Sequence, residues 1–316
     1  MITSLLKNLS IVFLFGACVS SSHSSKQEIP GKTNDNIDYI QPVLDSNNSR
    51  QSLMDLPQTQ YGGFVLKPGF YEAEFKTYCL QPGTPDPRQG DAYLQEPITG
   101  YRKDIVESVL LNSRTKHNID QRNIQLLLWS VVSGSDFNSL SYAVQSDATK
   151  LLTPKQIYEL KGGIVGTIKS VSYSTGILNA NKGMQELFSK GINSYETFEK
   201  LAVRKEQSNI IKKGIKYDQW YKQNENYYVR YFPVSYKKVR IQVYVPDSLL
   251  DADGKMNGEH VVFDPTGLQA VPAFTNAQRL GIGAPVIEML REIIQVNKHP
   301  IPQKKLPQKK NPKENV

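Results

Sequence analysis

Two side chains, Cys79 and Gln125, stand out for the chemistry that they can do together. Cys79 lies in Tyr78-Cys79-Leu80, and Gln125 lies in the otherwise apolar run Ile124–Trp129. Burying an amide without partners costs about 2–7 kcal/mol, so Gln125 must be satisfied by another group. One solution is a hydrogen bond, to a backbone group near Cys79 or to Gln121 one helical turn earlier. The other is covalent: a thiol attacks the amide carbon and expels ammonia, which leaves an internal thioester.

The residues around Cys79 and Gln125 resemble the two motifs of bacterial surface thioester domains. Tyr78-Cys79 corresponds to an aromatic–Cys motif, and Ile124–Trp129 to an apolar-Gln-x-x-apolar-apolar motif. The resemblance covers residues 61–134 and implies that Cys79 and Gln125 are the bonded pair, with Trp129 shielding the acyl group from water. It also implies covalent capture of an amine, such as a lysine of a host protein. The chain differs from that family in its lipoprotein-like N-terminus and in the shorter interval between the motifs.

The N-terminus has the order of charged and apolar residues that is typical of a secretory signal. Residues 1–17 hold Lys7 and then an apolar run that is too short to span a membrane. The following Phe15-Gly16-Ala17-Cys18 resembles the lipobox of bacterial lipoproteins, which implies that Cys18 becomes a lipidated N-terminus. We therefore expect a lipid-anchored protein of the bacterial envelope, in the outer membrane. The alternative is an ordinary signal peptide in which Cys18 is discarded.

A lipidated Cys18 leaves Cys79 without a disulfide partner, because the chain has two cysteines. A single remaining thiol in an exported protein indicates a functional thiol or an intermolecular disulfide. It is equally consistent with a small buried hydrophobic side chain.

The net charge of +8 is concentrated at the C-terminus, where residues 297–316 hold six lysines and one glutamate. The rest of the chain is nearly neutral and predicts no broad basic surface, so we expect no nucleic-acid partner. The tail repeats Pro-Gln-Lys-Lys and is expected not to fold.

Periodicity predicts an α+β fold. Residues 71–79 alternate as a half-buried strand, and strands are expected at 227–232, 237–245 and 261–263, the last as the partner of the strand at 237–245. Helices are expected at 104–112, 121–133, 140–152, 183–189 and 195–203, and a last one from Pro285. Asp120 is the expected N-cap of helix 121–133, which should be central because almost every face is apolar. The predicted organisation is a signal peptide (1–17), a flexible tether (18–60), a strand-and-helix thioester-like domain (61–205), a smaller antiparallel β-rich domain with a closing helix (212–297) and a disordered tail (298–316).

Other functions remain open at this stage. A cysteine hydrolase would need His117 or His260, with Asp264 to orient His260. The segment from Asp251 to Glu259 hints at a calcium loop but lacks the full spacing of ligands, so a hairpin turn is expected. No cofactor or metal is predicted. A further alternative is a non-catalytic envelope scaffold in which Cys79 is merely packed, and more generally we do not expect an enzyme.

A cluster of aromatic residues in the second half of the chain offers another binding hypothesis. Flat rings suit sugar binding, whereas alternation in a half-buried sheet explains the same residues without a ligand. The aromatic residues are Tyr217, Trp220, Tyr221, Tyr227, Tyr228 and Tyr231.

Overall fold

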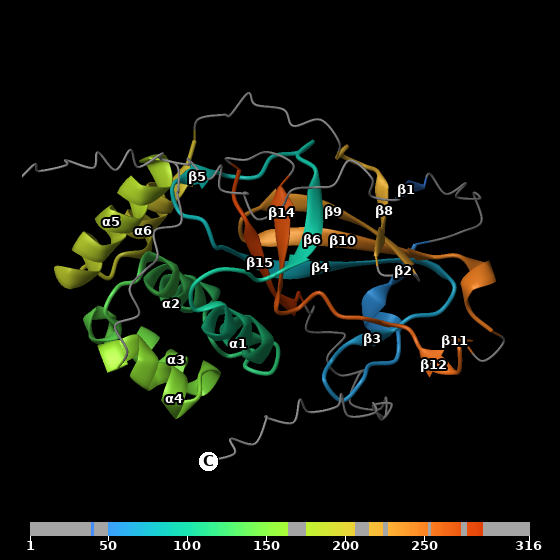
Figure 1. Cartoon of the computed structure of the whole chain (residues 1–316), viewed down its shortest axis with the longest axis horizontal. Helices are drawn as coiled ribbons and strands as arrows, with labels where there is room; N and C mark the ends of the chain where they lie inside the picture. Colours follow the sequence, from blue (N-terminus) through green and yellow to red (C-terminus); the bar gives the residue numbers. More distant parts are fainter. Residues whose placement is uncertain are drawn as a thin grey trace, which may run out of the picture.

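The computed structural model confirms the α+β fold, with a large, mostly antiparallel sheet and helices gathered at one end of it (Figure 1). The structure describes residues 39–40, 50–163, 175–205, 215–223, 227–251, 254–272 and 277–286. The predicted signal peptide, the lipidation site Cys18 and the C-terminal tail lie outside the described residues.

Strand β4 (Gly69–Cys79) is the organising strand of the nine-stranded sheet. It lies between β10 (Lys238–Val245) and β15 (Leu280–Pro285) and pairs antiparallel with both, while β2 (Gln51–Ser52) pairs parallel with it. Because β10 and β15 belong to the segment 212–297 and β4 to the segment 61–205, strands of both predicted segments share one sheet. The remaining strands are β1 (Tyr39–Ile40), β8 (Trp220–Gln223), β9 (Tyr227–Ser235), β14 (Leu268–Pro272) and β6 (Tyr93–Pro97), in the overall order β1-β8-β9-β10-β4-β15-β14-β6.

The register of β4 explains its buried side chains. Phe75 pairs with Val239, and both are fully buried on one face of the sheet. The sheet curls, so that β6 at one end approaches β9, where the Tyr231 hydroxyl donates to the Gln95 side chain. At its C-terminal end β4 is buried on both faces, because helices cover that end of the sheet.

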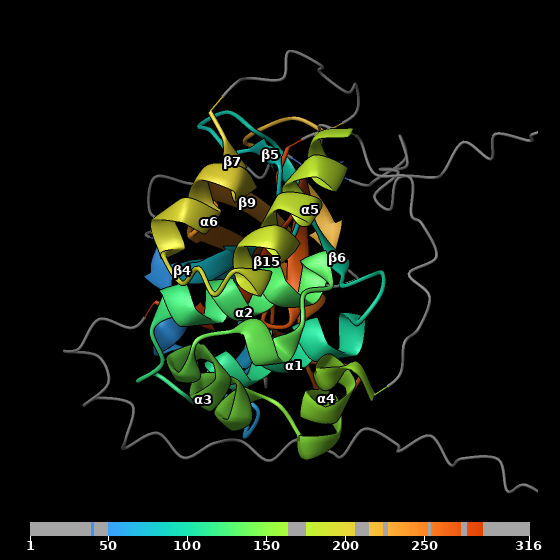
Figure 2. The same cartoon turned by 90° about the vertical axis from the view of Figure 1, so that its left-hand side faces the viewer.

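Helix α2 (Gln121–Ser133) lies at the centre of the helical layer, as its apolar surface predicts. It packs against α1 (Lys103–Ser113) and α3 (Tyr142–Leu151) on one side and α5 (Thr175–Ser189) and α6 (Tyr195–Ala202) on the other (Figure 2). It also contacts β4, so it joins the helices to the sheet. A short helix α4 (Pro154–Tyr158) follows α3, and single turns of 3-10 helix cover Leu53–Asp55, Phe137–Ser139 and Asp247–Leu249.

Local capping signals fix where these helices begin and end. The Asp120 side chain accepts from the backbone N–H of Arg122 at the start of α2, as predicted. Gly134 ends α2 at φ 74°, in the left-handed conformation that glycine adopts without strain. Thr153 forms a capping box with Gln156 at the start of α4.

One expectation about the C-terminal half is corrected by the pairing of short strands, and the expected last helix lies largely outside the described residues. Residues 261–263 were expected to pair with the strand at 237–245, but β13 (Val262–Phe263) pairs with β3 (Phe64–Val65), because β4 and β9 already occupy both edges of β10. Pro285 ends β15 rather than starting a helix, and the residues after Val286 lie outside the described part. The other short pairs are β5 (Thr84–Pro85) with β7 (Val203–Arg204) and β11 (Lys255–Met256) with β12 (Glu259–His260).

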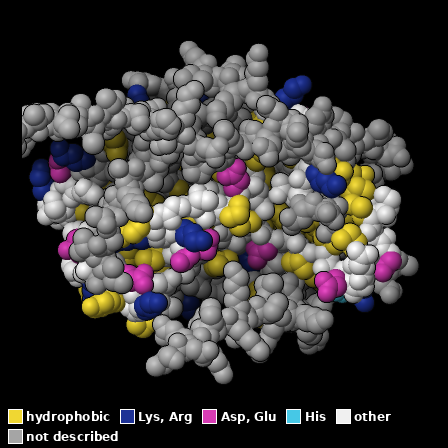
Figure 3. Space-filling view, viewed as in Figure 1, with side chains coloured by type: hydrophobic (Ala, Val, Ile, Leu, Met, Phe, Trp, Pro, Cys, Tyr) yellow, Lys and Arg dark blue, Asp and Glu magenta, His cyan; other side chains and the backbone are white. Residues whose placement is uncertain are grey.

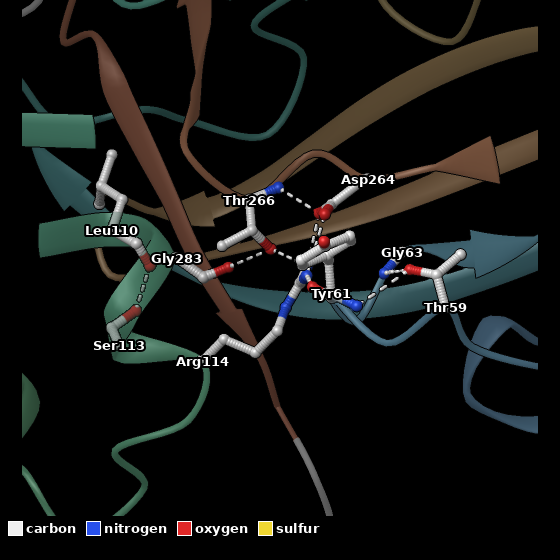
Figure 4. Close-up of polar contacts among 9 residues, drawn as sticks. All are labelled: Thr59, Tyr61, Gly63, Leu110, Ser113, Arg114, Asp264, Thr266 and Gly283. Atoms are coloured by element: carbon white, nitrogen blue, oxygen red, sulfur yellow. Dashed lines mark hydrogen bonds and ion pairs between the residues drawn. The ribbon is translucent and has the colours of Figure 1, made fainter. Parts of the chain in front are cut away.

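Arg114 ties α1 to the loops around β3 and β13 (Figure 4). Its guanidinium group donates to the Tyr61 carbonyl oxygen at 2.6 Å, to both carboxylate oxygens of Asp264 and to the Thr266 hydroxyl. Gly62 permits this approach, since a Cβ there would lie 2.6 Å from Arg114 atoms. One mostly buried cation, 12% exposed, therefore holds together segments that are far apart in the sequence.

The described surface mixes both signs of charge. On the face seen in Figure 3, Lys and Arg side chains lie beside Asp and Glu side chains, with scattered apolar groups between them. Several of the basic side chains pair with acidic ones, such as Lys238 with Glu74 and Arg50 with Glu72.

Candidate functional site

Cys79 and Gln125 lie together, as the sequence predicted, at the end of β4. The backbone N–H of Cys79 donates to Oε1 of Gln125 at 2.8 Å, and Nε2 of Gln125 donates to the Cys79 carbonyl oxygen at 3.0 Å. Both side chains are almost completely buried. The polar side chain in the apolar helix is therefore satisfied by the backbone of the cysteine.

The Gln125 amide takes the place of a neighbouring strand. β10 pairs with β4 as far as Lys76, and the Thr77 N–H still donates to the Lys237 carbonyl oxygen; beyond this point no described strand lies beside that edge of β4. Helix α2 fills this gap with two glutamines on one face: Gln121 donates to the carbonyl oxygens of Thr77 and Lys237, and Gln125 binds Cys79. Buried backbone groups need such partners, so the spacing of four residues between the glutamines fits α2 against the strand edge.

This arrangement separates the Gln125 amide from the direction of the thiol. The backbone N–H and C=O of a strand residue lie in the plane of the sheet, whereas its side chain projects from the face. The Gln125 amide therefore lies beside the strand edge, with both of its ends occupied, while the Cys79 side chain projects from the face.

The Cys79 thiol is held in its protonated form. Burial raises the pKa of the thiol to about 12, and the negative charge of Asp86 also raises it. The Trp129 indole and the Gln81 backbone, which act as hydrogen-bond donors to the sulfur, lower this pKa by less than burial raises it. At pH 8 only about one molecule in ten thousand then carries a thiolate. The resting thiol is consequently a poor nucleophile toward reagents in solution.

Trp129 forms an aromatic wall beside the thiol. Its ring is fully buried and stacks on Tyr195 with 5.5 Å between the ring centroids. The Tyr195 hydroxyl shares a hydrogen bond of 2.6 Å with Tyr236, and the cations of Arg122 and Lys237 lie over the Tyr195 ring. The indole N–H of Trp129 has no partner of normal hydrogen-bond geometry among the described residues, although it is close enough to lower the pKa of the thiol. From the thiol outward, the aromatic rings of Trp129 and Tyr195 therefore come first, and the cations of Arg122 and Lys237 follow.

Gln278 is a further buried glutamine near this cysteine, and sequence reasoning missed it. It has no exposed surface and lies two residues before β15, the strand that pairs with the end of β4. Its Nε2 donates to the carbonyl oxygens of Thr84 (3.2 Å) and Ala202 (3.4 Å), and its Oε1 has no hydrogen-bond partner within the described residues. Its neighbours in the sequence carry no helical or strand periodicity, so only the pairing of distant strands reveals that it is buried.

The hydrolase alternative is not supported by the positions of its residues. His117 and His260 are exposed, whereas Cys79 is fully buried, and the Asp264 carboxylate is bound by Arg114 and Thr266 (Figure 4). The histidines therefore have no contact with the thiol that would make them its base.

The residues of the calcium-loop and sugar-binding hypotheses have structural roles that explain them without a ligand. Oδ1 of Asp251 accepts from the backbone N–H of Lys255, which makes this segment a tight hairpin turn; Asp253 lies outside the described residues. Within the described ranges no group of three or more His, Cys, Asp or Glu side chains is placed to hold a metal ion.

Four of the six aromatic residues of the sugar-binding hypothesis are buried in the sheet core rather than presented to solvent: Trp220, Tyr221, Tyr227 and Tyr231.

Comparison with protein-family models, with curated proteins and with solved structures finds no match for this chain. In the part of the chain that the structure describes, no helix is both long enough and apolar enough to cross a membrane.

Proposed function

We propose that this chain is a lipid-anchored protein of the bacterial envelope with a binding or adhesive role, which captures amines covalently through an internal thioester at Cys79. The motif resemblance assigns the acyl group to Gln125. The observation that supports the proposal best is the convergence of a buried thiol, an aromatic wall and side-chain amides at the end of β4.

The chemistry balances without a cofactor. The Cys79 sulfur forms a bond to the side-chain carbonyl carbon of a glutamine, the bond from that carbon to the amide nitrogen breaks, and the thiol proton leaves with the nitrogen as ammonia. An amine then attacks the acyl carbon, an amide forms and the thiol is regenerated. Exclusion of water by Trp129 and Tyr195 protects the thioester from hydrolysis.

Intact mass tests this proposal on the full chain carrying Cys18→Ser, in which Cys79 is the remaining thiol. The purified protein is expected to weigh one ammonia less than its sequence and to gain one methylamine on incubation with that amine. Cys79→Ala in the same background is the control and should abolish the deficit. A protein of full mass, with one thiol that alkylates after denaturation, would exclude the thioester.

A non-catalytic scaffold lipoprotein is the second candidate, and the geometry of Gln125 favours it. Both ends of that amide bind the backbone of Cys79, which is sufficient to explain why a glutamine is buried in α2. In this case Cys79 is a packed apolar residue, and replacing it with alanine leaves partner binding unchanged.

The anchor is tested separately at Cys18. Because the lipobox-like Phe15-Gly16-Ala17-Cys18 follows an apolar run, we expect radiolabelled palmitate to enter the wild-type protein. Cys18→Ala should remove the label, while Cys79→Ala, which changes the other cysteine, should retain it. Equal labelling of wild type and Cys18→Ala would rule out lipidation at this residue.

A further inference from the structure

The Gln125 amide is poorly placed to be the acyl group of a thioester. Its oxygen and nitrogen are both engaged by the backbone of Cys79, at 2.8 Å and 3.0 Å. An attack on its carbonyl carbon would expel the nitrogen that satisfies the Cys79 carbonyl oxygen and leave that buried group unpaired. The Gln125 amide also reaches β4 in the plane of the sheet, whereas the Cys79 thiol projects from the face of the sheet.

Gln278 has the opposite properties. Its amide nitrogen is held by two carbonyl oxygens, those of Thr84 and Ala202, while its amide oxygen is buried without a hydrogen-bond donor among the described residues. An unpaired buried carbonyl is costly and calls for an explanation, of which a role in catalysis is one. Since the two carbonyl contacts require the nitrogen at one end of the amide, the same contacts fix the unpaired oxygen at the other end.

The register of the sheet places Gln278 next to the end of the strand that carries the thiol. Leu280 is the cross-strand partner of Cys79, and the backbone N–H of Leu80 donates to the carbonyl oxygen of Arg279, which continues the ladder by one residue. Gln278 precedes this last ladder contact and lies outside β15, so it stands beside the end of β4 without being part of the strand. A glutamine side chain at this place is long enough to reach toward Cys79.

Tyr93 provides independent support for this proximity. Its hydroxyl donates to the Gln278 backbone carbonyl oxygen at 3.0 Å, and a charge on Cys79 acts on the same hydroxyl. The phenol group therefore fixes the Gln278 backbone, and it lies within the range at which a charge on Cys79 acts on it. The segment after Cys79 folds over them as well, because Gln81 donates its backbone N–H to the thiol and Thr84 accepts from Gln278.

We propose that Gln278, rather than Gln125, supplies the acyl group to Cys79, while Gln125 holds the backbone of the cysteine. This inference rests on the proposed function, and it assigns the reaction to a different glutamine. The Cys79 sulfur bonds to the Gln278 side-chain carbonyl carbon, the bond to Nε2 breaks, and ammonia leaves with the thiol proton from a position between the carbonyl oxygens of Thr84 and Ala202. The product joins the ends of β4 and β15 by a covalent bond.

The test uses the full, unsubstituted chain and isotopically labelled methylamine. Aminolysis converts the reactive glutamine to its N-methylamide, and peptide mass spectrometry then locates the label. We expect the label on Gln278 in a chain that showed the deficit of one ammonia. A label on Gln125, or on any other glutamine, overturns this inference and leaves the proposed thioester standing. A chain with neither deficit nor label overturns the proposed function, and this inference with it.

Two matched variants give a second readout. Gln278→Met keeps the length of the side chain but has no acyl group, so the mass deficit should disappear. Gln269→Met changes another buried glutamine, on β14, whose Nε2 donates to the Pro97 carbonyl oxygen, and it should retain the deficit. Circular dichroism establishes that each variant is folded, and the label position in the unsubstituted chain decides the result if either variant fails to fold.

Discussion

Gln125→Met is expected to destabilise the fold by about 2–5 kcal/mol. The substitution keeps the length of the side chain but leaves the backbone N–H and C=O of Cys79 buried without partners, and each unsatisfied group costs about 1–3 kcal/mol. No water replaces them, because the surroundings at this point are fully buried. Urea unfolding followed by circular dichroism measures the loss as a lower midpoint at constant slope.

The same substitution one turn earlier is the control. Gln121 also donates to backbone carbonyl oxygens, of Thr77 and Lys237, but it is half-buried and water can take its place. Gln121→Met should therefore cost less than about 1 kcal/mol. Equal losses of unfolding free energy in the two variants would show that the Gln125 amide stabilises the contact between α2 and the edge of β4 no more than Gln121 does.

Arg114→Ala is expected to cost about 2–4 kcal/mol. It leaves the Asp264 carboxylate, which is 28% exposed, without the guanidinium group that binds both of its oxygens, and it removes the bond to Tyr61. Breaking a fully buried pair costs about 3–5 kcal/mol, and partial exposure of Asp264 reduces this. Arg114→Lys should give an intermediate loss, since an ammonium group cannot make the paired contacts of the guanidinium.

Arg122→Ala is the matched control for Arg114. Arg122 also pairs with a carboxylate, that of Glu196, but both side chains are about 60% exposed. The ion pair and the contact of Arg122 with the Tyr195 ring together should contribute less than about 1 kcal/mol to the free energy of unfolding. A loss for Arg114→Ala no larger than that for Arg122→Ala would contradict the role of Arg114 as a clamp between distant segments. Since Arg114 binds Tyr61, Asp264 and Thr266 rather than Cys79, Arg114→Ala should also leave the predicted mass deficit intact in the folded protein.

Elements defined by local signals were predictable from the sequence. The Asp120 cap, the apolar faces of α2 and the strand at 71–79 are each contained in a few neighbouring residues, and the structure has all three. The alternation of buried and partly exposed residues stops at Thr77, because helices cover both sides of the strand's end. The meeting of Cys79 and Gln125 followed from the same reasoning, because a buried amide must find a partner.

The order of the strands was not predictable in this way. β4 pairs with β10 and β15 from the far half of the chain, and no local pattern states which distant edge a strand will meet. Dividing the chain near residues 205–212 followed a change in local character, whereas the sheet is built from strands on both sides of that division.

Gln278 illustrates why part of the site escaped sequence analysis. Gln125 attracts notice because its neighbours in the sequence are apolar, whereas Gln278 follows Ala277 and precedes Arg279. Its burial arises from residues 194 and 76 positions away, Thr84 and Ala202, and so exists only in the folded chain.

The position of β4 between two strands from the end of the chain has a consequence for synthesis and export. A chain that emerges N-terminus first presents β4 and α2 long before β15, because the contact between Thr84 and Gln278 spans 194 residues. Cys79 therefore remains without its cross-strand partner until the chain extends to Leu280. A product that stops before residue 278 lacks both Leu280 and Gln278. Any reactive bond between Cys79 and Gln278 would then form only in chains that extend past Gln278, so that shorter products would leave the ribosome or the export channel chemically inert.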